Sequence, residues 1–150
     1  MNKKTQKINL VNMIIIVVIF LLELMLGSVK LVFSGGEGKP PIIELTSYFP
    51  DCEKILTGLP ILVLIIALIT ISIMIINAVM LVDESVKLTI ISTVLTSVCL
   101  LGSVLLVALV RKYVTIHNLI IMLLFLVTAI LNSVKLRISI MRGAQFVSTK

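Results

Sequence analysis

One acidic residue, Glu23, lies inside a long apolar stretch of this sequence. An ionisable side chain well inside a membrane span costs about 2.5–3.5 kcal/mol on insertion scales, and such residues are typical of ion or proton sites. Glu23 is therefore a candidate protonatable group. The alternative is a structural carboxyl group that hydrogen-bonds a neighbouring helix or pairs with Lys30, which shares its face if both belong to one helix.

Three further residues join Glu23 in this candidate ion or proton site: Lys30, Ser103 and His117. His117 follows the start of the fourth apolar run, where it is either the outer partner of Glu23 in proton transfer or an interfacial side chain without function. Because the sequence places no second His or Cys beside it, we predict neither a metal site nor a cofactor.

Small polar residues recur along one face of the third apolar run. Such a stripe predicts either a packing seam that lets helix backbones approach or a hydrated track through the protein. Gly102 lies beside it. The stripe consists of Thr89, Ser92, Thr96, Cys99 and Ser103.

A second polar pattern appears when the depths of all four runs are compared. Asn12, Asn77, Ser92 and Asn132 all fall about 10 Å inward of the midplane, at ~1.5 Å of rise per residue. This predicts an inner polar layer with one side chain from each helix. The layer is either a closed hydrogen-bond network or the inner constriction of a pore.

The elements that position these residues are four apolar runs at residues 8–33, 59–82, 88–110 and 114–136. Hydrophobic residues make up 59% of the 150 residues, and the mean hydropathy is +1.25. Each run has the roughly 20 apolar residues that a spanning helix needs. The links at 83–87 and 111–113 are short, so we expect an all-α membrane protein, an antiparallel four-helix bundle in a single domain.

The segment 34–57 is expected to be the one sizeable loop, on the outer side. It opens with Gly35, Gly36 and Gly38, followed by Pro40 and Pro41, which end any helix leaving the first run. Residues 42–45 are expected to form a short strand, and residues 51–56 a helical turn. Cys52 lies in this loop and Cys99 within the third run, so the two are not expected to form a disulfide.

The charge pattern predicts orientation rather than a nucleic-acid partner. The formal net charge is +6, with basic residues at both ends of the chain, including Lys3, Lys4, Lys135 and Arg137. This bias favours cytoplasmic N and C termini. A cleaved signal peptide is the alternative for the first run, but the run is long and no small-x-small cleavage site follows it.

No nucleophile–base set or phosphate-binding glycine loop is present in the sequence. We therefore expect a non-enzymatic multi-pass membrane protein that acts by interaction, as an accessory subunit, assembly factor or membrane organiser. Its partners are expected to be the lipid bilayer and either another protein or further copies of itself. The alternative is a small ion- or proton-coupled transporter, or a channel-forming oligomer, that uses Glu23.

Overall fold

The structure, a computed structural model, describes residues 3–25, 29–33, 42–49, 58–82, 85–110 and 114–148. Its elements in chain order are α1 (Lys3–Leu24), β1 (Val29–Phe33), β2 (Ile42–Thr46), α2 (Gly58–Val82), α3 (Val86–Val110) and α4 (Ile116–Ser148). All four helices are long and apolar enough to cross a membrane. The prediction of four apolar helices of membrane-spanning length is therefore confirmed, and it fits a multi-pass membrane protein.

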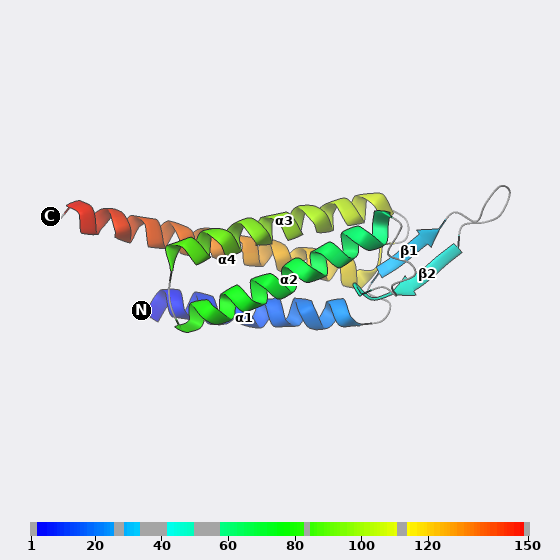
Figure 1. Cartoon of the computed structure of the whole chain (residues 1–150), viewed down its shortest axis with the longest axis horizontal. Coiled ribbons are helices and arrows are strands. Elements are labelled where there is room, and N and C mark those ends of the chain that lie inside the picture. Colours follow the sequence, from blue (N-terminus) through cyan, green and yellow to red (C-terminus); the bar gives the residue numbers. More distant parts are fainter. Residues whose placement is uncertain are drawn as a thin grey trace.

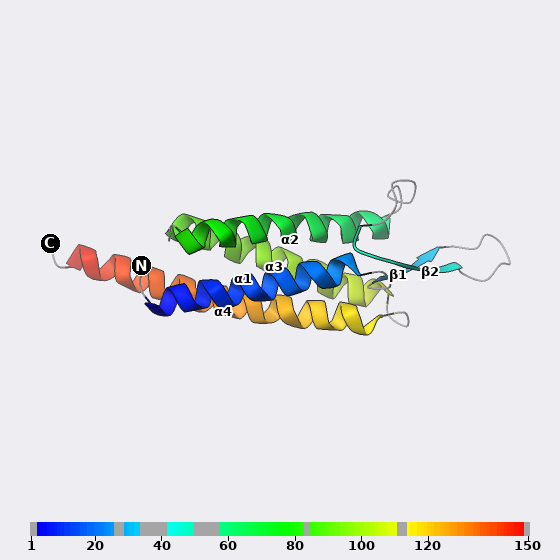
Figure 2. The same cartoon turned by 90° about the horizontal axis from the view of Figure 1, so that it is seen from below.

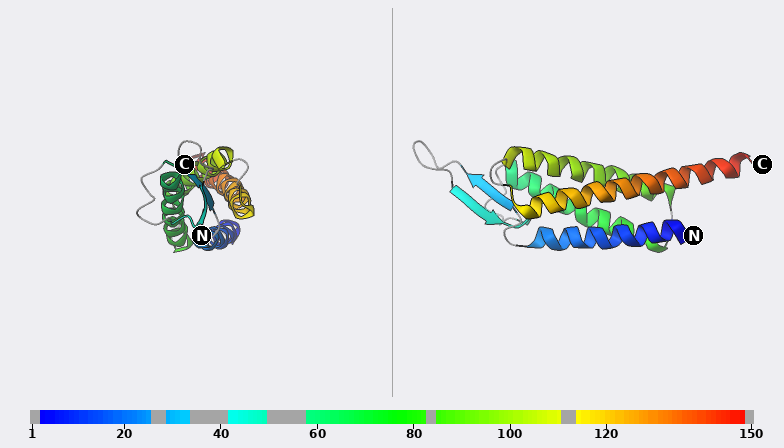
Figure 3. Two further views of the ribbon diagram at one scale, coloured as in Figure 1. Left: turned by 90° about the vertical axis from the view of Figure 1, so that its right-hand side faces the viewer. Right: turned by 180° about the vertical axis from the view of Figure 1, so that it is seen from behind.

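The four helices lie side by side, and the two strands project from one end (Figures 1 and 2). Helices α1 and α3 each pack against both α2 and α4. The start of α1 and the end of α4 lie together at the opposite end from the strands (Figure 1). We call these two ends the terminal end and the hairpin end. Seen from the hairpin end, the strands lie across the middle of the ring of helices (Figure 3, left).

The inside of this bundle holds most of the small polar side chains of the helices together with an apolar core, and the outward faces are mainly apolar. On α3 the buried residues include the whole predicted stripe, Thr89, Ser92, Thr96, Cys99 and Ser103. Large apolar side chains on the same helix, such as Val94 and Leu101, are exposed. Lipid solvates apolar surfaces but cannot hydrogen-bond polar groups, so a spanning bundle places its polar groups inside.

Helix α1 ends at Leu24, earlier than the predicted boundary at residue 33. Residues 29–33 form β1 instead, which pairs antiparallel with β2 so that Lys30 lies opposite Leu45. The predicted single helical face for Glu23 and Lys30 is therefore wrong. Gly27 and Ser28 are poor helix formers, and the β-branched Val29 and Val32 favour a strand. The predicted strand at 42–45 is confirmed as part of β2.

The base of the hairpin is inserted between the helices. Val29 of β1 and Tyr48, which follows β2, are both fully buried in the hydrophobic core. The backbone N–H of Tyr48 donates to the carbonyl oxygen of Glu23 at 2.9 Å, and Met25 N–H donates to Leu22 O at 3.2 Å. Non-helical backbone at membrane depth is tolerated only where protein satisfies its polar groups, and these bonds do so at the end of α1.

Helix α4 begins with a cap and extends beyond its predicted end. The Thr115 hydroxyl accepts a hydrogen bond from the backbone N–H of Asn118 at 3.2 Å, as expected of an N-cap residue. The helix continues to Ser148, past the predicted boundary at residue 136. Cys99 is a buried free thiol. Cys52 and the predicted helical turn at 51–56 lie outside the described residues.

Candidate functional site

The carboxyl group of Glu23 is fully buried near the end of α1. Its Oε1 accepts a hydrogen bond from Thr70 Oγ1 at 2.9 Å. Its Oε2 has no hydrogen-bond partner among the described residues. Thr70 lies about half-way along α2, roughly 18 Å from its start at ~1.5 Å per residue. The Glu23 carboxyl group is therefore deep in the bundle and has unused capacity to bind a proton or a cation.

Helix α3 and the hairpin complete the surroundings of this carboxyl group. Cys99 Sγ approaches Ile66 O at 3.9 Å, and Thr70 Oγ1 lies 3.0 Å from the same oxygen. Ser103, which is also buried, has no hydrogen-bond partner for its Oγ among the described residues. We define the hairpin-end site as Glu23, Tyr48, Thr70, Cys99, Ser103 and Asn118.

Tyr48 enters the hairpin-end site from the segment that follows β2 and reaches α4 with its hydroxyl. Its hydroxyl donates to Asn118 Oδ1 at 3.1 Å, which links the hairpin to the first turn of α4. Burial raises the pKa of the Tyr48 phenol, and the nearby Glu23 and Cys99 raise it further. Tyr48 therefore stays a neutral hydrogen-bond donor at physiological pH. Asn118 Nδ2 has no partner among the described residues.

A second polar group lies in the other half of the bundle. Asn12 Nδ2 donates to Asn132 Oδ1 at 2.6 Å. Asn132 Nδ2 in turn lies 3.2 Å from both Ser92 Oγ and Thr96 Oγ1. These contacts join α1, α3 and α4. Asn77 is buried at the corresponding place on α2, but its Nδ2 donates to Ile73 O of its own helix at 2.9 Å.

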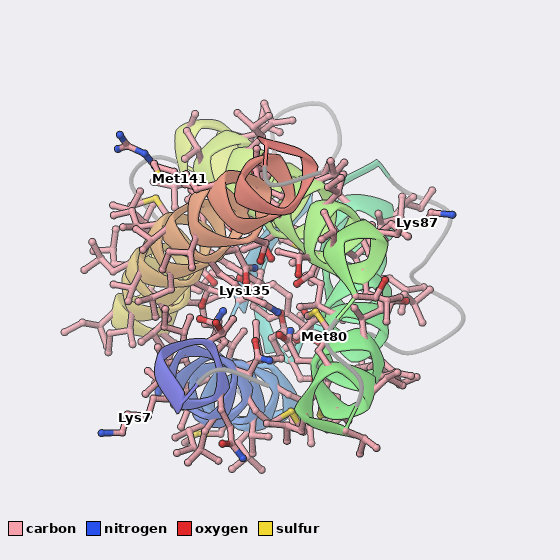
Figure 4. All side chains as sticks on the ribbon, turned by 90° about the vertical axis from the view of Figure 1, so that its left-hand side faces the viewer. Lys7, Met80, Lys87, Lys135 and Met141 are labelled. Carbon is pink, nitrogen blue, oxygen red and sulfur yellow. The ribbon has the colours of Figure 1, made fainter. Side chains whose placement is uncertain are left out.

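One helical turn nearer the terminal end, polar groups converge on Met80. Asn9 Nδ2 donates to Met80 O at 2.9 Å. Lys135 Nζ and Thr89 Oγ1 lie 2.9 Å and 3.6 Å from Met80 Sδ. Lys135 points into the bundle, whereas Lys7 and Lys87 point away from it (Figure 4). We define the terminal-end cluster as Asn9, Asn12, Asn77, Met80, Thr89, Ser92, Thr96, Asn132 and Lys135.

The terminal-end cluster also has unused acceptors. The Oδ1 atoms of Asn9, Asn12 and Asn77 are buried without a hydrogen-bond partner among the described residues. Buried polar groups are nearly always hydrogen-bonded, to protein or to ordered water. Three such oxygens on two neighbouring helices therefore leave this part of the interior able to accept further hydrogen bonds.

Apolar side chains separate the two polar groups on three helices. Ile16 and Ile19 lie between Asn12 and Glu23 on α1, and all are fully buried. On the other two helices the separator is defined by Ile73 on α2 and Phe125 on α4. Ile121, one turn before Phe125, is also fully buried. On α3 the polar stripe is continuous, because Thr96 and Cys99 share one buried face.

The structure brings only part of the predicted ion site together. Glu23 and Ser103 are buried, whereas Lys30 lies on β1 and is only partly buried. His117 is also partly exposed, and its neighbour Asn118 faces the interior instead. In the described part of the chain, neither Lys30 nor His117 bonds to Glu23. Of the predicted inner layer, Asn12, Ser92 and Asn132 are joined by hydrogen bonds, and Asn77 is buried without a bond to them.

Sequence reasoning missed three contributors, Tyr48, Thr70 and Lys135. Lys135 was expected to mark the membrane boundary, but it is fully buried. Its spacing from Asn132 and Thr128, three and seven residues, is a helical signal that places it on the polar face. Thr70 lies seven residues before Asn77, and this helical spacing likewise places it on the polar face of its helix. Tyr48 has no such signal, because it lies outside the spans.

Asn132→Leu is expected to destabilise the bundle by about 1–3 kcal/mol, because it removes contacts to three side chains and interhelical hydrogen bonds in membranes contribute about 0.6–1.7 kcal/mol each. Thermal unfolding in mild detergent measures the change. Ser133→Ala is the matched control, since Ser133 is exposed and its hydroxyl donates to Ala129 O of its own helix. Equal melting temperatures for the two variants would show that the network contributes nothing.

Together the fold and the buried groups define a class: a four-span integral membrane protein with a polar interior divided by apolar side chains. No protein-family model, curated protein or solved structure matches this chain. No group of three or more His, Cys, Asp or Glu residues suited to a metal ion occurs among the described residues.

Proposed function

We propose that the protein is a small ion- or proton-coupled transporter, or one subunit of a channel-forming oligomer, in which Glu23 binds the coupled proton or cation. The observation that carries this proposal is the fully buried carboxyl group with one oxygen bonded to Thr70 and the other unused. Acidic residues buried within spans typically mark ion pathways or proton relays.

The contacts of Thr70 suit reversible binding. Its hydroxyl lies within hydrogen-bond distance of both Glu23 Oε1 and Ile66 O. One hydroxyl proton serves one acceptor at a time. When a proton or cation occupies Oε2, Oε1 becomes a weaker acceptor, and the Thr70 hydroxyl can turn to Ile66 O. It returns to Oε1 when the carboxylate is empty. No covalent chemistry is required, which agrees with a non-enzymatic role.

In this proposal the hairpin-end site and the terminal-end cluster are two successive binding sites along the pathway. The hairpin-end site opens to one aqueous phase, and the terminal-end cluster to the other. The continuous polar face of α3 offers the path between them, and the separator of Ile16, Ile19, Ile73 and Phe125 prevents an open leak. Four helices leave little room for a pathway, so we expect at least a dimer, with both termini on the cytoplasmic side.

The test is flux in proteoliposomes across a range of pH and with Na⁺ or K⁺ gradients. Wild-type protein is expected to carry flux, and Glu23→Gln is expected to reduce it at least about tenfold, since the amide binds neither a proton nor a cation comparably. Glu44→Gln is the matched control, because Glu44 belongs to β2 outside the four spans. The proposal would be refuted if the wild-type protein carried no flux, or if Glu23→Gln carried the same flux as the wild type.

An interaction role, as accessory subunit, assembly factor or membrane organiser, is the second candidate. The observation that favours it is the separator, because three of the four helices interrupt the polar path in a single copy. The outward faces of all four helices are apolar and available to a partner helix. Purification from the native membrane with measurement of stoichiometry distinguishes the two, and a solitary monomer with ion flux would exclude this candidate.

A further inference from the structure

The segment Ser47–Phe49 leaves the hairpin and enters the bundle. Ser47 is 8% exposed and Tyr48 is 0% exposed, although both follow a strand outside the four spans. Tyr48 is among the largest fully buried side chains of the described residues. We call Ser47–Phe49 the strap.

The strap is attached to two helices. At one side the backbone N–H of Tyr48 donates to Glu23 O, which belongs to the last turn of α1. At the other side the Tyr48 hydroxyl donates to Asn118 Oδ1 in the first turn of α4. Tyr48 therefore bridges α1 and α4 at the level where the Glu23 carboxyl group faces the interior.

Two further contacts hold the strap itself. The ring of Phe49 meets Phe20 of α1 edge to face, with centroids 6.2 Å apart. The Ser47 hydroxyl accepts the backbone N–H of Phe49 at 3.2 Å, which fixes a tight local turn. These contacts remain when the Tyr48 hydroxyl is removed. The bond between Tyr48 and Asn118 is therefore the separable part of the attachment.

We propose that the strap closes the hairpin-end site against the aqueous phase and that release of Tyr48 from Asn118 opens it. What the opening admits, a proton or a hydrated cation, rests on the function proposed above. The closure itself does not. Asn118 is suited to this role because one water molecule can donate to its Oδ1 in place of the Tyr48 hydroxyl, and another can accept from its Nδ2, which has no partner among the described residues.

Cys99 provides a native reporter for this opening. Its thiol is fully buried and lies 3.9 Å from Ile66 O, the oxygen that Thr70 also approaches. A charged, membrane-impermeant methanethiosulfonate reagent reaches Cys99 only through water. With Cys52 replaced by Ser, the rate of mass increase in proteoliposomes therefore measures how often the hairpin-end site is hydrated.

Wild-type protein is expected to react slowly. Tyr48→Phe is expected to react about tenfold faster, the change in an opening equilibrium that corresponds to one lost neutral hydrogen bond. Tyr48→Ala is expected to react faster still, since the covering ring is also removed. Tyr113→Phe, the same change at the other tyrosine of the sequence, is the matched control and is expected to leave the rate unchanged.

Asn118→Ala separates opening from misfolding. It is expected to raise the rate as much as Tyr48→Phe, and the double variant no more than either single one, because both remove the same bond. The proposed closure would be overturned if the rate increases of Tyr48→Phe and Asn118→Ala added up in the double variant. It would also be overturned if both Tyr48 variants reacted at the wild-type rate. Fast reaction of the wild type would overturn it too. The labelling readout is independent of flux. If the Tyr48 variants label at the wild-type rate while Glu23→Gln loses flux, only the proposed closure by the strap is refuted. If the Tyr48 variants label faster while Glu23→Gln keeps the wild-type flux, only the proposed transport function is refuted.

Discussion

Replacing Phe125 with asparagine is expected to make the bundle leak protons or small cations at least about tenfold faster than the wild type, whereas Phe125→Ala is expected to cost stability without a leak. Phe125 is fully buried on α4, between Asn118 and Asn132. Removing a buried Phe side chain typically costs about 3–5 kcal/mol, because the surroundings collapse only partly around the cavity.

The two substitutions differ because hydration requires polar partners. An apolar cavity stays dry even when a water molecule would fit. The other separator residues, Ile16, Ile19 and Ile73, offer no hydrogen bonds. The nearest buried hydroxyls, Thr96 and Thr128, already donate to carbonyl oxygens of their own helices, so the alanine cavity is expected to remain dry. An asparagine amide instead supplies donors and an acceptor beside the polar face of α3. Water can then connect the hairpin-end site to the terminal-end cluster.

Proteoliposomes loaded with a pH-sensitive dye measure the leak, and thermal unfolding in detergent measures the stability of both variants. Leu126→Asn is the matched control, because Leu126 is 43% exposed on the outward face of the same helix. Leu126→Asn places an asparagine amide at nearly the same depth, but on the outward face, where it cannot connect the hairpin-end site to the terminal-end cluster. Equal leak in Phe125→Asn and Leu126→Asn would show that the separator is not the barrier.

The arrangement of polar groups was predictable where it follows helical spacing. The stripe on α3 is buried as its spacing indicated, because a helix in lipid has one face that can share hydrogen bonds. The depth comparison also selected Asn132 with Asn12 and Ser92, and Asn132 hydrogen-bonds both of them, whereas Asn77 bonds its own helix. In both cases a regular helix carries residues of known spacing to known positions.

Predictions failed where the backbone changes its geometry. The apolar run continues from α1 into β1, and hydropathy does not distinguish a helix from an apolar strand, so the end of α1 and the placement of Lys30 were wrong. Tyr48 reaches the interior only because the hairpin folds back between the helices. Lys135 was counted among the basic residues that indicate orientation, because a basic residue near a helix end usually extends to the headgroups, but it is fully buried.

Glu23 is the residue at which stability and function are expected to oppose each other. Glu23→Met keeps an unbranched side chain of similar length and removes the carboxyl group. An acidic side chain within a span costs about 2.5–3.5 kcal/mol, and one hydrogen bond to Thr70 returns only about 0.6–1.7 kcal/mol. Thr70 also keeps Ile66 O as an acceptor, so its hydroxyl is not left unsatisfied.

Glu23→Met is therefore expected to stabilise the protein by about 1–3 kcal/mol while abolishing flux. Unfolding in detergent measures the first effect and proteoliposomes the second. Thr70→Val is the comparison for stability: it also breaks the bond between the two residues but leaves the carboxyl group buried, so it is expected to destabilise. If Glu23→Met destabilises as Thr70→Val does, Glu23 serves the structure. If Glu23→Met stabilises the protein, the buried carboxyl group lowers the stability of the wild type, and a functional role explains why it is present.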